Sequence, residues 1–219
     1  MSLIVFDLDG TLVDSRRDLA ESTNEMLATY GAPPFPIDDV ARMVGEGAKK
    51  LVERALAAAG LDPAEPEALQ RFRDIYDRRL LMHTRPYEGI PALVRDLSAA
   101  HTLAVLTNKP EAPSRRLLDA FELAVAFRRV IGGDSEWPRK PDPAGLRALM
   151  REFGATPQST VLVGDSMIDV ETARRAGVPM CVALYGFGQL RGELVLDGTE
   201  LTVTRAGDIA QAITACHPR

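Results

Sequence analysis

Short apolar runs alternate with amphipathic segments along most of this 219-residue chain, and that alternation restricts its fold more than any other feature. Each run is rich in Val, Leu and Ile and ends in a polar turn, which is typical of strands buried on both faces of a parallel sheet. The runs occupy residues 3–6, 102–106, 129–131, 160–163, 178–184 and 201–204. Helical periodicity fills the intervals at residues 90–100, 114–121, 143–153, 168–176 and 208–215. The pattern predicts a doubly wound, mostly parallel α/β sheet with a Rossmann-like core.

Residues 15–85 depart from this alternation, because they show helical periodicity but no evident strand. Gly31 and Gly60 stand where C-terminal caps of helices belong. We therefore expect an α-helical cap domain at 15–85, inserted after the first strand, and an α/β catalytic core made of residues 1–14 and 86–219. An insertion at that point lies over the carboxyl edge of the sheet, where open α/β sheets bind their ligands.

The charge and composition exclude several classes of partner. A net charge of −5, with no basic run longer than a pair, argues against binding to nucleic acid or to an anionic membrane surface. No apolar stretch approaches the roughly 18 residues that a membrane-spanning helix needs, and the first residues lack the basic start of a signal peptide. We expect a cytoplasmic protein whose partner is a small molecule. An oligomer is possible, but the sequence does not indicate one.

Polar residues that could carry chemistry follow the predicted strands. Because the carboxyl ends of parallel strands meet at one edge of the sheet, these residues should converge there. Four carboxylates at one edge would repel one another strongly, and a bound phosphate would add to the repulsion. A hard divalent cation with oxygen ligands removes this conflict, and Mg²⁺ is the usual choice beside a phosphate. The residues are Asp7, Asp9, Thr107, Asn108, Lys140, Asp165 and Asp169.

Paired carboxylates on one strand end suit the transfer of a phosphoryl group. One carboxylate can attack phosphorus and form an aspartyl phosphate, which divides a difficult displacement into two easier ones. A second carboxyl group two residues later can protonate the leaving oxygen and then activate water. A small hydroxyl residue and a lysine at neighbouring strand ends can hold the phosphoryl oxygens.

The segment Asp7-Leu-Asp9-Gly-Thr11 resembles the signature of the haloacid dehalogenase superfamily. Thr107, the pair Lys140-Pro141 and the segment Gly164-Asp165-Ser-Met-Ile-Asp169 match the other three motifs of that superfamily in the right order. The resemblance covers essentially the whole chain, and the helical insertion is similar to one of the superfamily's cap types. The presence of an aspartate at position 9 distinguishes the chain from the dehalogenating members.

What this resemblance implies is a set of roles. Asp7 would be the nucleophile and Asp9 the general acid and base. Mg²⁺ would be held by Asp7, Asp165 and the main-chain carbonyl of Asp9, with Asp169 in or next to that coordination shell. The phosphoryl group would be bound by Thr107, Asn108 and Lys140.

Three stretches are similar to phosphoglycolate phosphatases of that superfamily, namely 6–15, 43–56 and 106–110. If this similarity extends to function, the turn at Gly45–Gly47 faces the site, and its amides together with Arg17 or Lys49 bind a small carboxylate. The alternative for the two glycines is a break between helices.

The leading hypothesis is thus an Mg²⁺-dependent phosphomonoesterase acting on a small phosphorylated metabolite, with 2-phosphoglycolate as the first candidate. A sugar-phosphate mutase or a pyrophosphatase of the same superfamily is the alternative, and a non-catalytic phosphate- or metal-binding regulator is a remote one. Ser166 either caps the helix that follows it or faces the site. Lys109 is expected to be solvated and to take no part.

Overall fold

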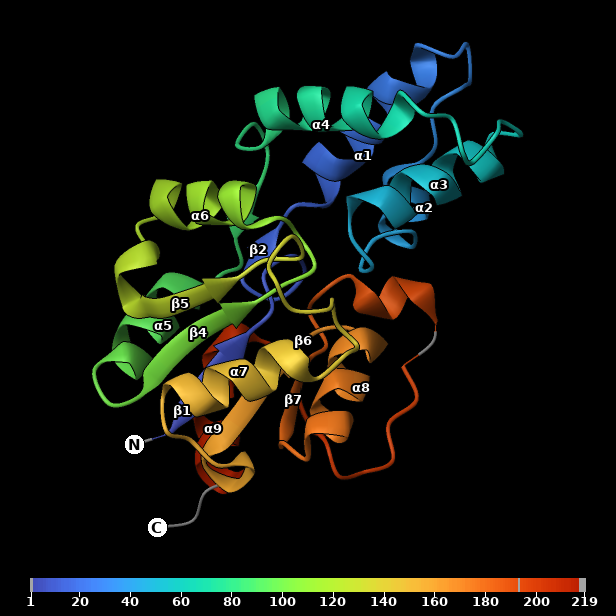
Figure 1. The fold of residues 1–219 in the computed structure, drawn as a ribbon. Coiled ribbons are helices and arrows are strands. Elements are labelled where there is room, and N and C mark those ends of the chain that lie inside the picture. The colour runs from blue at the N-terminus through green and yellow to red at the C-terminus, as the bar shows by residue number, and fades with distance from the viewer. Residues whose placement is uncertain (1, 193, 217–219) are drawn as a thin grey trace.

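Six parallel strands form the central sheet of the protein (Figure 1), as the alternating pattern predicts. The computed structural model describes residues 2–192 and 194–216. The strand order is β5-β4-β1-β6-β7-β8, so the strand that leads to Asp7 lies in the middle of the sheet. The strands are β1 (Leu3–Phe6), β4 (Thr102–Leu106), β5 (Phe127–Ile131), β6 (Thr160–Gly164), β7 (Met180–Ala183) and β8 (Leu201–Val203).

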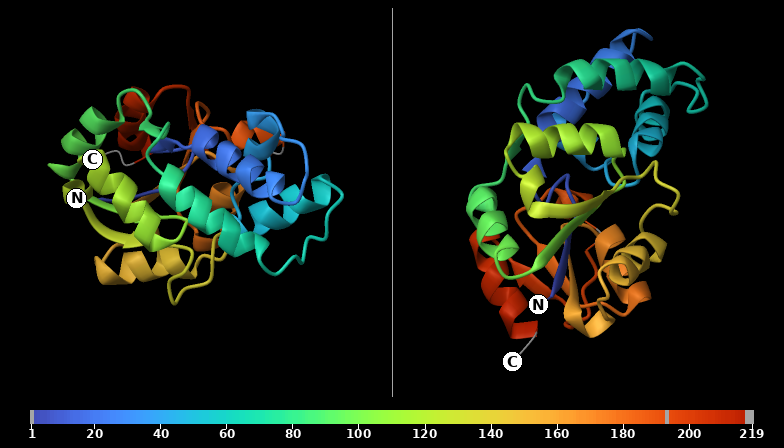
Figure 2. Two further views of the ribbon diagram at one scale, coloured as in Figure 1. Left: turned by 90° about the horizontal axis from the view of Figure 1, so that it is seen from above. Right: turned by 60° about the vertical axis from the view of Figure 1, so that its left-hand side comes forward.

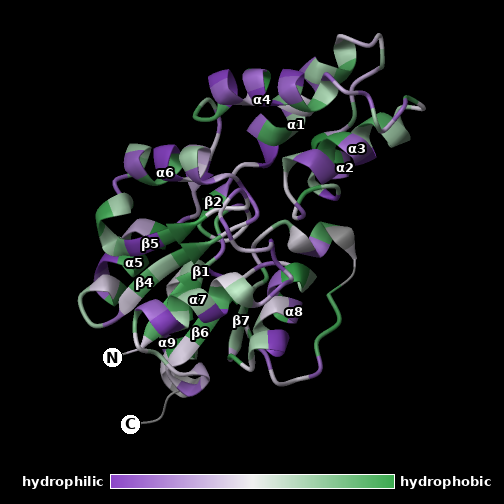
Figure 3. Ribbon diagram, viewed as in Figure 1, coloured by the Kyte–Doolittle hydropathy of each residue, from purple (hydrophilic) through white to green (hydrophobic). Residues whose placement is uncertain are grey.

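Helices cover both faces of this sheet, because its central strands are apolar on both sides. Ile4 and Phe6 of β1 point into one hydrophobic core, and Leu3 and Val5 point into the other. The strands are accordingly mostly hydrophobic, whereas the outer faces of the helices are polar (Figure 3). The first core is covered by α5 (Ile90–Ser98), α6 (Glu111–Ala120) and α9 (Ile209–Cys216), and the second by α7 (Ala144–Glu152) and α8 (Met167–Ala176). Single 3₁₀ turns lie at η1 (Ala124–Ala126), η2 (Pro157–Ser159), η3 (Gly188–Arg191) and η4 (Ala206–Asp208).

The helices that come between β1 and β4 in the sequence form a group that stands above the carboxyl edge of the strands (Figure 2). Their apolar stripes meet around Met26, Leu56 and Phe72, which are buried. Two short strands, β2 (Val13–Asp14) and β3 (Arg85–Pro86), pair in antiparallel fashion where the chain enters and leaves this group. The helices are α1 (Arg16–Ala28), α2 (Ile37–Ala41), α3 (Ala48–Ala58) and α4 (Ala68–Arg79). We refer to residues 15–85 as the cap.

Element ends differ from the predicted ranges where specific contacts decide them. Strand β5 starts two residues earlier than predicted, because the ring of Phe127 packs edge-on against Phe6 with 6.1 Å between centroids. Strand β7 starts two residues later, because the amide of Val178 still donates to the carbonyl of Ala173 at the end of α8. Within the described residues, no helix is both long and apolar enough to cross a membrane.

Candidate active site

The predicted residues at the strand ends do converge at one edge. The amide of Asp7 donates to the carbonyl of Val163 over 2.8 Å, which continues the pairing of β1 with β6 by one residue. The amide of Thr107 likewise donates to the carbonyl of Ile131 over 3.0 Å and extends the pairing of β4 with β5. Asp165 directly follows β6. Regular strand pairing, rather than a specialised loop, therefore places these three side chains.

Gly10 allows the chain to turn sharply after the two aspartates. Its φ of +89° lies in the region that favours glycine, and a Cβ atom there would lie 2.0 Å from Oδ2 of Asp165. The same oxygen of Asp165 accepts a hydrogen bond of 2.8 Å from the amide of Gly188. The missing side chain at position 10 thus lets the Asp165 carboxylate lie directly against the turn that carries Asp7 and Asp9.

Three carboxylates form a compact acidic group that fits a divalent cation. Oxygens of Asp7, Asp165 and Asp169 all lie within 4.8 Å of one another. Burial raises the pKa of Asp7 to about 6, and the charge of Asp169 adds to this rise while Lys140 opposes it. Burial, followed by repulsion from Asp169 and Asp7, also raises the pKa of Asp165 well above its usual value. Carboxylate oxygens are the ligands that Mg²⁺ prefers, and an ion here would relieve the repulsion.

Lys140 is the cation of this group in the structure. Its Nζ lies 2.9 Å from Oδ1 of Asp7 and 2.6 Å from Oδ1 of Asp169, and its side chain is 2% exposed. Burial alone would lower the pKa of this ammonium group, but the charges of Asp169 and Asp7 outweigh burial, so the pKa lies above its usual value. Lys140 is therefore held as a cation beside the predicted nucleophile.

Asp169 orients its neighbours as well as adding charge. Its Oδ2 accepts hydrogen bonds from the amide and the hydroxyl of Ser166, at 3.1 and 2.6 Å, and its Oδ1 accepts the bond from Lys140. Ser166 stands at the N-terminal end of α8 and also lines the cavity described below. Both alternatives for this residue, a position at the start of the helix and one facing the site, therefore apply.

Asn108 joins the core to the cap. Its Nδ2 donates to the carbonyl oxygens of Gly45 and Lys140, each over 2.9 Å. Both amide protons are thereby used within the protein, whereas Oδ1 of Asn108 is buried without a hydrogen-bond partner among the described residues. Gly47 packs equally close to the core, because a Cβ atom there would lie 3.1 Å from both the Asn108 carbonyl and Nη1 of Arg139.

The prediction that Lys109 is solvated was wrong. Its side chain is 5% exposed, and its Nζ lies 3.1 Å from each carboxylate oxygen of Asp9. The same Nζ donates a hydrogen bond of 2.6 Å to the hydroxyl of Tyr76, which comes from α4 of the cap. The sequence feature that could have indicated a place in the site is its position directly after Thr107 and Asn108, at a strand end.

A cavity of about 500 Å³ lies between core and cap, above these groups. Asp7, Asp9, Thr107 and Asp165 line it from the core. Residues of the cap that line it include Gly45, Gly47, Leu51, Phe72, Arg73 and Tyr76.

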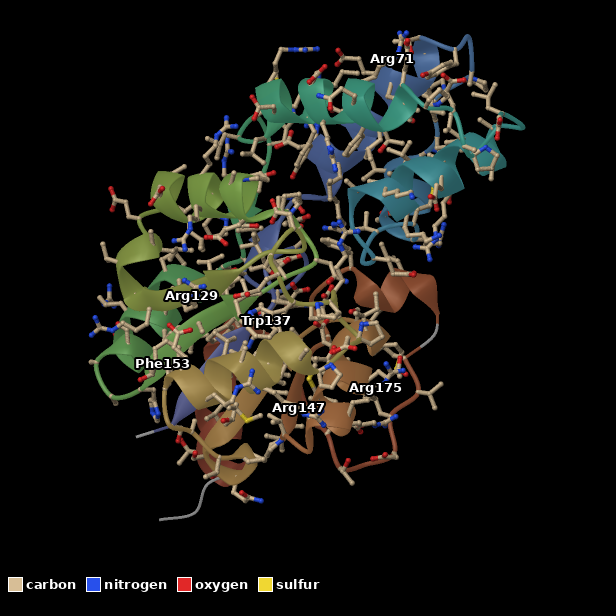
Figure 4. The ribbon with its side chains drawn as sticks, viewed as in Figure 1. Arg71, Arg129, Trp137, Arg147, Phe153 and Arg175 are labelled. Carbon is tan, nitrogen blue, oxygen red and sulfur yellow. The ribbon has the colours of Figure 1, made fainter. Side chains whose placement is uncertain are left out.

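The structure does not bring Arg17 to this cavity, since its guanidinium group bonds Glu21 on an exposed face of α1. Lys49 likewise lies 3.8 Å from Glu53 at the surface. Arg129, Arg147 and Arg175 lie on the part of the core away from the cap (Figure 4) and do not line the cavity. The cavity therefore receives its positive charge from other residues.

Comparison with known proteins gives a consistent result. The sequence model of the haloacid dehalogenase-like hydrolases matches residues 4–183. The chain is 44% identical over 194 residues to a phosphoglycolate phosphatase of Rhodospirillum rubrum, a match that covers 85% of this chain and 80% of that protein. It is 40% identical over 221 residues to a phosphoglycolate phosphatase of Caulobacter vibrioides, covering 97% of this chain and 92% of the other.

Among solved structures, that of a predicted phosphoglycolate phosphatase from Haemophilus somnus superposes with a TM-score of 0.89 at 31% identity. The superposition covers 97% of this chain and 98% of the other, and thus includes the cap as well as the core. The chain therefore belongs to the haloacid dehalogenase-like hydrolases, as a phosphatase.

Proposed function

We propose that this phosphatase is an Mg²⁺-dependent phosphomonoesterase that acts on a small phosphorylated metabolite, with 2-phosphoglycolate as the first candidate. The observation that carries the proposal is the separation of two neighbouring carboxylates into different environments. Asp7 belongs to the acidic group and pairs with Lys140, whereas Asp9 lies outside that group and pairs with Lys109. Two carboxylates with different partners suit two different chemical roles.

In the first step, an oxygen of Asp7 bonds to phosphorus while the bond from phosphorus to the leaving oxygen breaks. Asp9 gives its proton to that leaving oxygen, and the product alcohol departs. Lys140 and the hydroxyl of Thr107 provide donors for the phosphoryl oxygens. When bound, Mg²⁺ would supply further positive charge for those oxygens, and Asp7 and Asp165 would hold it, with Asp169 in or next to its coordination shell.

In the second step, water attacks phosphorus and the bond from phosphorus to Asp7 breaks. Asp9, now ionised, takes a proton from that water, so both carboxylates return to their initial states and inorganic phosphate leaves. The cap covers the site and limits the access of other water molecules, which protects the acyl phosphate between the steps.

The substrate assignment rests on the cavity and on the relatives. A cavity of about 500 Å³ that is also lined by Asp7 and Asp165 has room for a small phosphate ester. The relatives with 40% and 44% identity are phosphoglycolate phosphatases. Gly45 and Gly47 of the cap line the cavity, which supports a role for this turn at the end of the substrate away from phosphorus.

A panel of phosphorylated metabolites, assayed with Mg²⁺ and with EDTA, tests the proposal. We expect 2-phosphoglycolate to have the highest kcat/KM, and EDTA to abolish turnover. In Asp7→Asn, turnover should fall by more than roughly 1,000-fold, because the nucleophile is lost. Turnover by this variant at the wild-type rate would refute the aspartyl-phosphate mechanism. A clear preference for another metabolite would refute the substrate assignment alone.

A further inference from the structure

Lys109 is enclosed between a residue of the core and a residue of the cap. Its ammonium group has three N–H donors, and the partners around it are the two oxygens of Asp9, at 3.1 Å each, and the hydroxyl of Tyr76, at 2.6 Å. The Tyr76 ring also lies beneath this cation, with 4.5 Å between Nζ and the ring centroid. The side chain is 5% exposed, so water does not compete for these contacts.

The two lysines of the site are thus assigned to different carboxylates. Lys140 contacts Asp7 and Asp169, and Lys109 contacts Asp9 and Tyr76. Because the donors of Lys109 are already directed at these partners, this lysine is poorly placed to bind the phosphoryl group. Its contact with Asp9, rather than a contact with the substrate, therefore explains its contribution to the reaction better.

The carboxylate of Asp9 is held from two directions. Its Oδ1 accepts a hydrogen bond of 2.6 Å from the hydroxyl of Ser15, which is completely buried, and Lys109 bridges both oxygens from the other side. A general acid and base has to present one oxygen within hydrogen-bond distance of the leaving oxygen and later of water. A displacement of about 1 Å in such a group can cost about 100-fold in rate.

We propose that Lys109 is a positioning residue that fixes the orientation of the Asp9 carboxylate, and that Tyr76 of the cap fixes Lys109 in turn. This inference rests on the proposed function, because it assigns a partner to the acid and base of that reaction. Neither residue transfers a proton or contacts phosphorus. Since Tyr76 comes from α4, the orientation of Asp9 depends on the cap being docked on the core as it is in this structure.

The dependence of the rate on the leaving group distinguishes this positioning role of Lys109 from a purely structural one. An alkoxide such as that of 2-phosphoglycolate leaves slowly unless it is protonated, whereas p-nitrophenolate leaves readily without a proton. A misplaced Asp9 should therefore slow the first step for 2-phosphoglycolate far more than for p-nitrophenyl phosphate. The second step needs Asp9 as a base whatever the substrate was, so it should be slowed for both.

The experiment compares Lys109→Met and Tyr76→Phe with the wild type by stopped flow in the presence of Mg²⁺. With p-nitrophenyl phosphate, Lys109→Met should release about one equivalent of p-nitrophenolate per site in a burst, followed by slow turnover. With 2-phosphoglycolate, kcat should fall by roughly 100-fold, within the range of a lost acid–base contribution, without a burst and with little change in KM. Tyr76→Phe keeps the ring and loses only the hydroxyl, so its effects should have the same pattern and be smaller.

Two substitutions serve as matched controls. Lys50→Met removes an exposed lysine of α3 that pairs with Glu53, and Tyr30→Phe removes a buried cap hydroxyl for which the described residues offer no hydrogen-bond partner. Both should leave the kinetics of both substrates unchanged. Equal losses on the two substrates without a burst, or unchanged kinetics in Lys109→Met and Tyr76→Phe, would overturn the inference. If the wild type does not hydrolyse 2-phosphoglycolate, the proposed substrate fails, and the burst with p-nitrophenyl phosphate still decides the role of Lys109.

Discussion

Asp18 near the start of α1 accepts hydrogen bonds from both the amide and the hydroxyl of Thr84, 66 residues later in the chain and each 2.7 Å away. The same carboxylate accepts two further bonds from the amide of His83, at 2.9 and 3.1 Å. Asp18 is completely buried. One side chain thus ties the segment that enters the cap to the segment that leaves it.

Replacement of Asp18 by Asn should destabilise the protein by roughly 2–3 kcal/mol. The Asn amide group presents N–H donors to backbone N–H donors, and at least one of these buried groups loses its acceptor. Chemical denaturation, monitored by circular dichroism, measures the free energy of unfolding. Asp62→Asn is the matched control, because Asp62 accepts a single amide hydrogen bond at an exposed position. We expect it to change stability by less than about 0.5 kcal/mol, and an equal loss in both variants would contradict the role of Asp18.

Gly10→Ala should abolish most of the activity. A Cβ atom at this position would lie 2.0 Å from an Asp165 oxygen, so either that carboxylate or the turn that carries Asp9 has to move. We expect kcat/KM to fall by about 100-fold or more, on the scale that a misplacement of about 1 Å produces. Affinity for Mg²⁺, measured by calorimetry, should fall in parallel.

Gly154→Ala is the control for this change. Gly154 also has a positive φ, +62°, but a Cβ atom there meets nothing within 4 Å. Only backbone strain remains, at about 1–2 kcal/mol, so the variant should be less stable and keep its kcat. Similar kinetics in the two variants would show that the contact with Asp165 is unimportant.

The stabilising effect of Mg²⁺ should increase with pH. Without metal, folding raises the pKa of Asp7 to about 6 and that of Asp165 well above its usual value, so folding favours their protonated forms. Their contribution to stability is therefore present at low pH and is lost as the pH rises through about 6. Mg²⁺ would bind the ionised forms and would therefore compete with these protons.

At pH 5, the proton on Asp7 should weaken Mg²⁺ binding roughly ten-fold relative to pH 7, because the pH lies one unit below a pKa of about 6. Differential scanning calorimetry with and without MgCl₂ measures this effect. The increase in Tm should be larger at pH 7 than at pH 5, and Asp165→Asn should remove most of it at both. An increase in Tm that does not depend on pH would argue against these carboxylates as ligands.

Arg73 should contribute to the recognition of an acidic substrate. It lines the cavity from α4, and among the described residues its side chain has no ion-pair partner. In Arg73→Gln, we expect KM for 2-phosphoglycolate to rise by about five- to ten-fold, the effect of losing an attraction of about 1 kcal/mol or slightly more. KM for p-nitrophenyl phosphate, which has no carboxylate, should change little.

Arg71→Gln provides the comparison on the same helix. Arg71 bonds Glu67, lies over the Tyr30 ring and is on the outside of the cap (Figure 4). Its replacement should leave KM unchanged for both substrates. If Arg73→Gln raises both KM values equally, Arg73 acts on the phosphate or on the cap as a whole rather than on the carboxylate.

The sheet and most of its strand-end residues could be predicted from local patterns. An apolar run followed by Asp7 or Asp165 is visible within a few residues of sequence, and parallel pairing then brings such positions together. The two-residue strands β2 and β3 were not predictable in this way. They are too short for a period to be seen, and they exist because the two ends of the cap run side by side.

Lys109 shows why the remainder of the site could not be predicted. Its partners Asp9 and Tyr76 are 100 and 33 positions away in the chain. Local sequence indicates only that a lysine follows a strand, and an isolated lysine is usually exposed. Asp18 is similar, since its hydrogen-bond donors lie 65 and 66 residues later in the chain, at the other end of the cap.

The position of β1 in the middle of the sheet has a mechanical consequence. The cap is attached immediately after this strand, so the paired segments β2 and β3 leave the core beside Asp9 rather than at the rim. If the cap rotates about these two segments, the parts of the cap that are distant from them travel furthest, whereas residues next to the attachment travel least. The main chain at Asp7 and Asp9 thus lies close to the axis of such a rotation, where opening the site to admit a substrate moves it least.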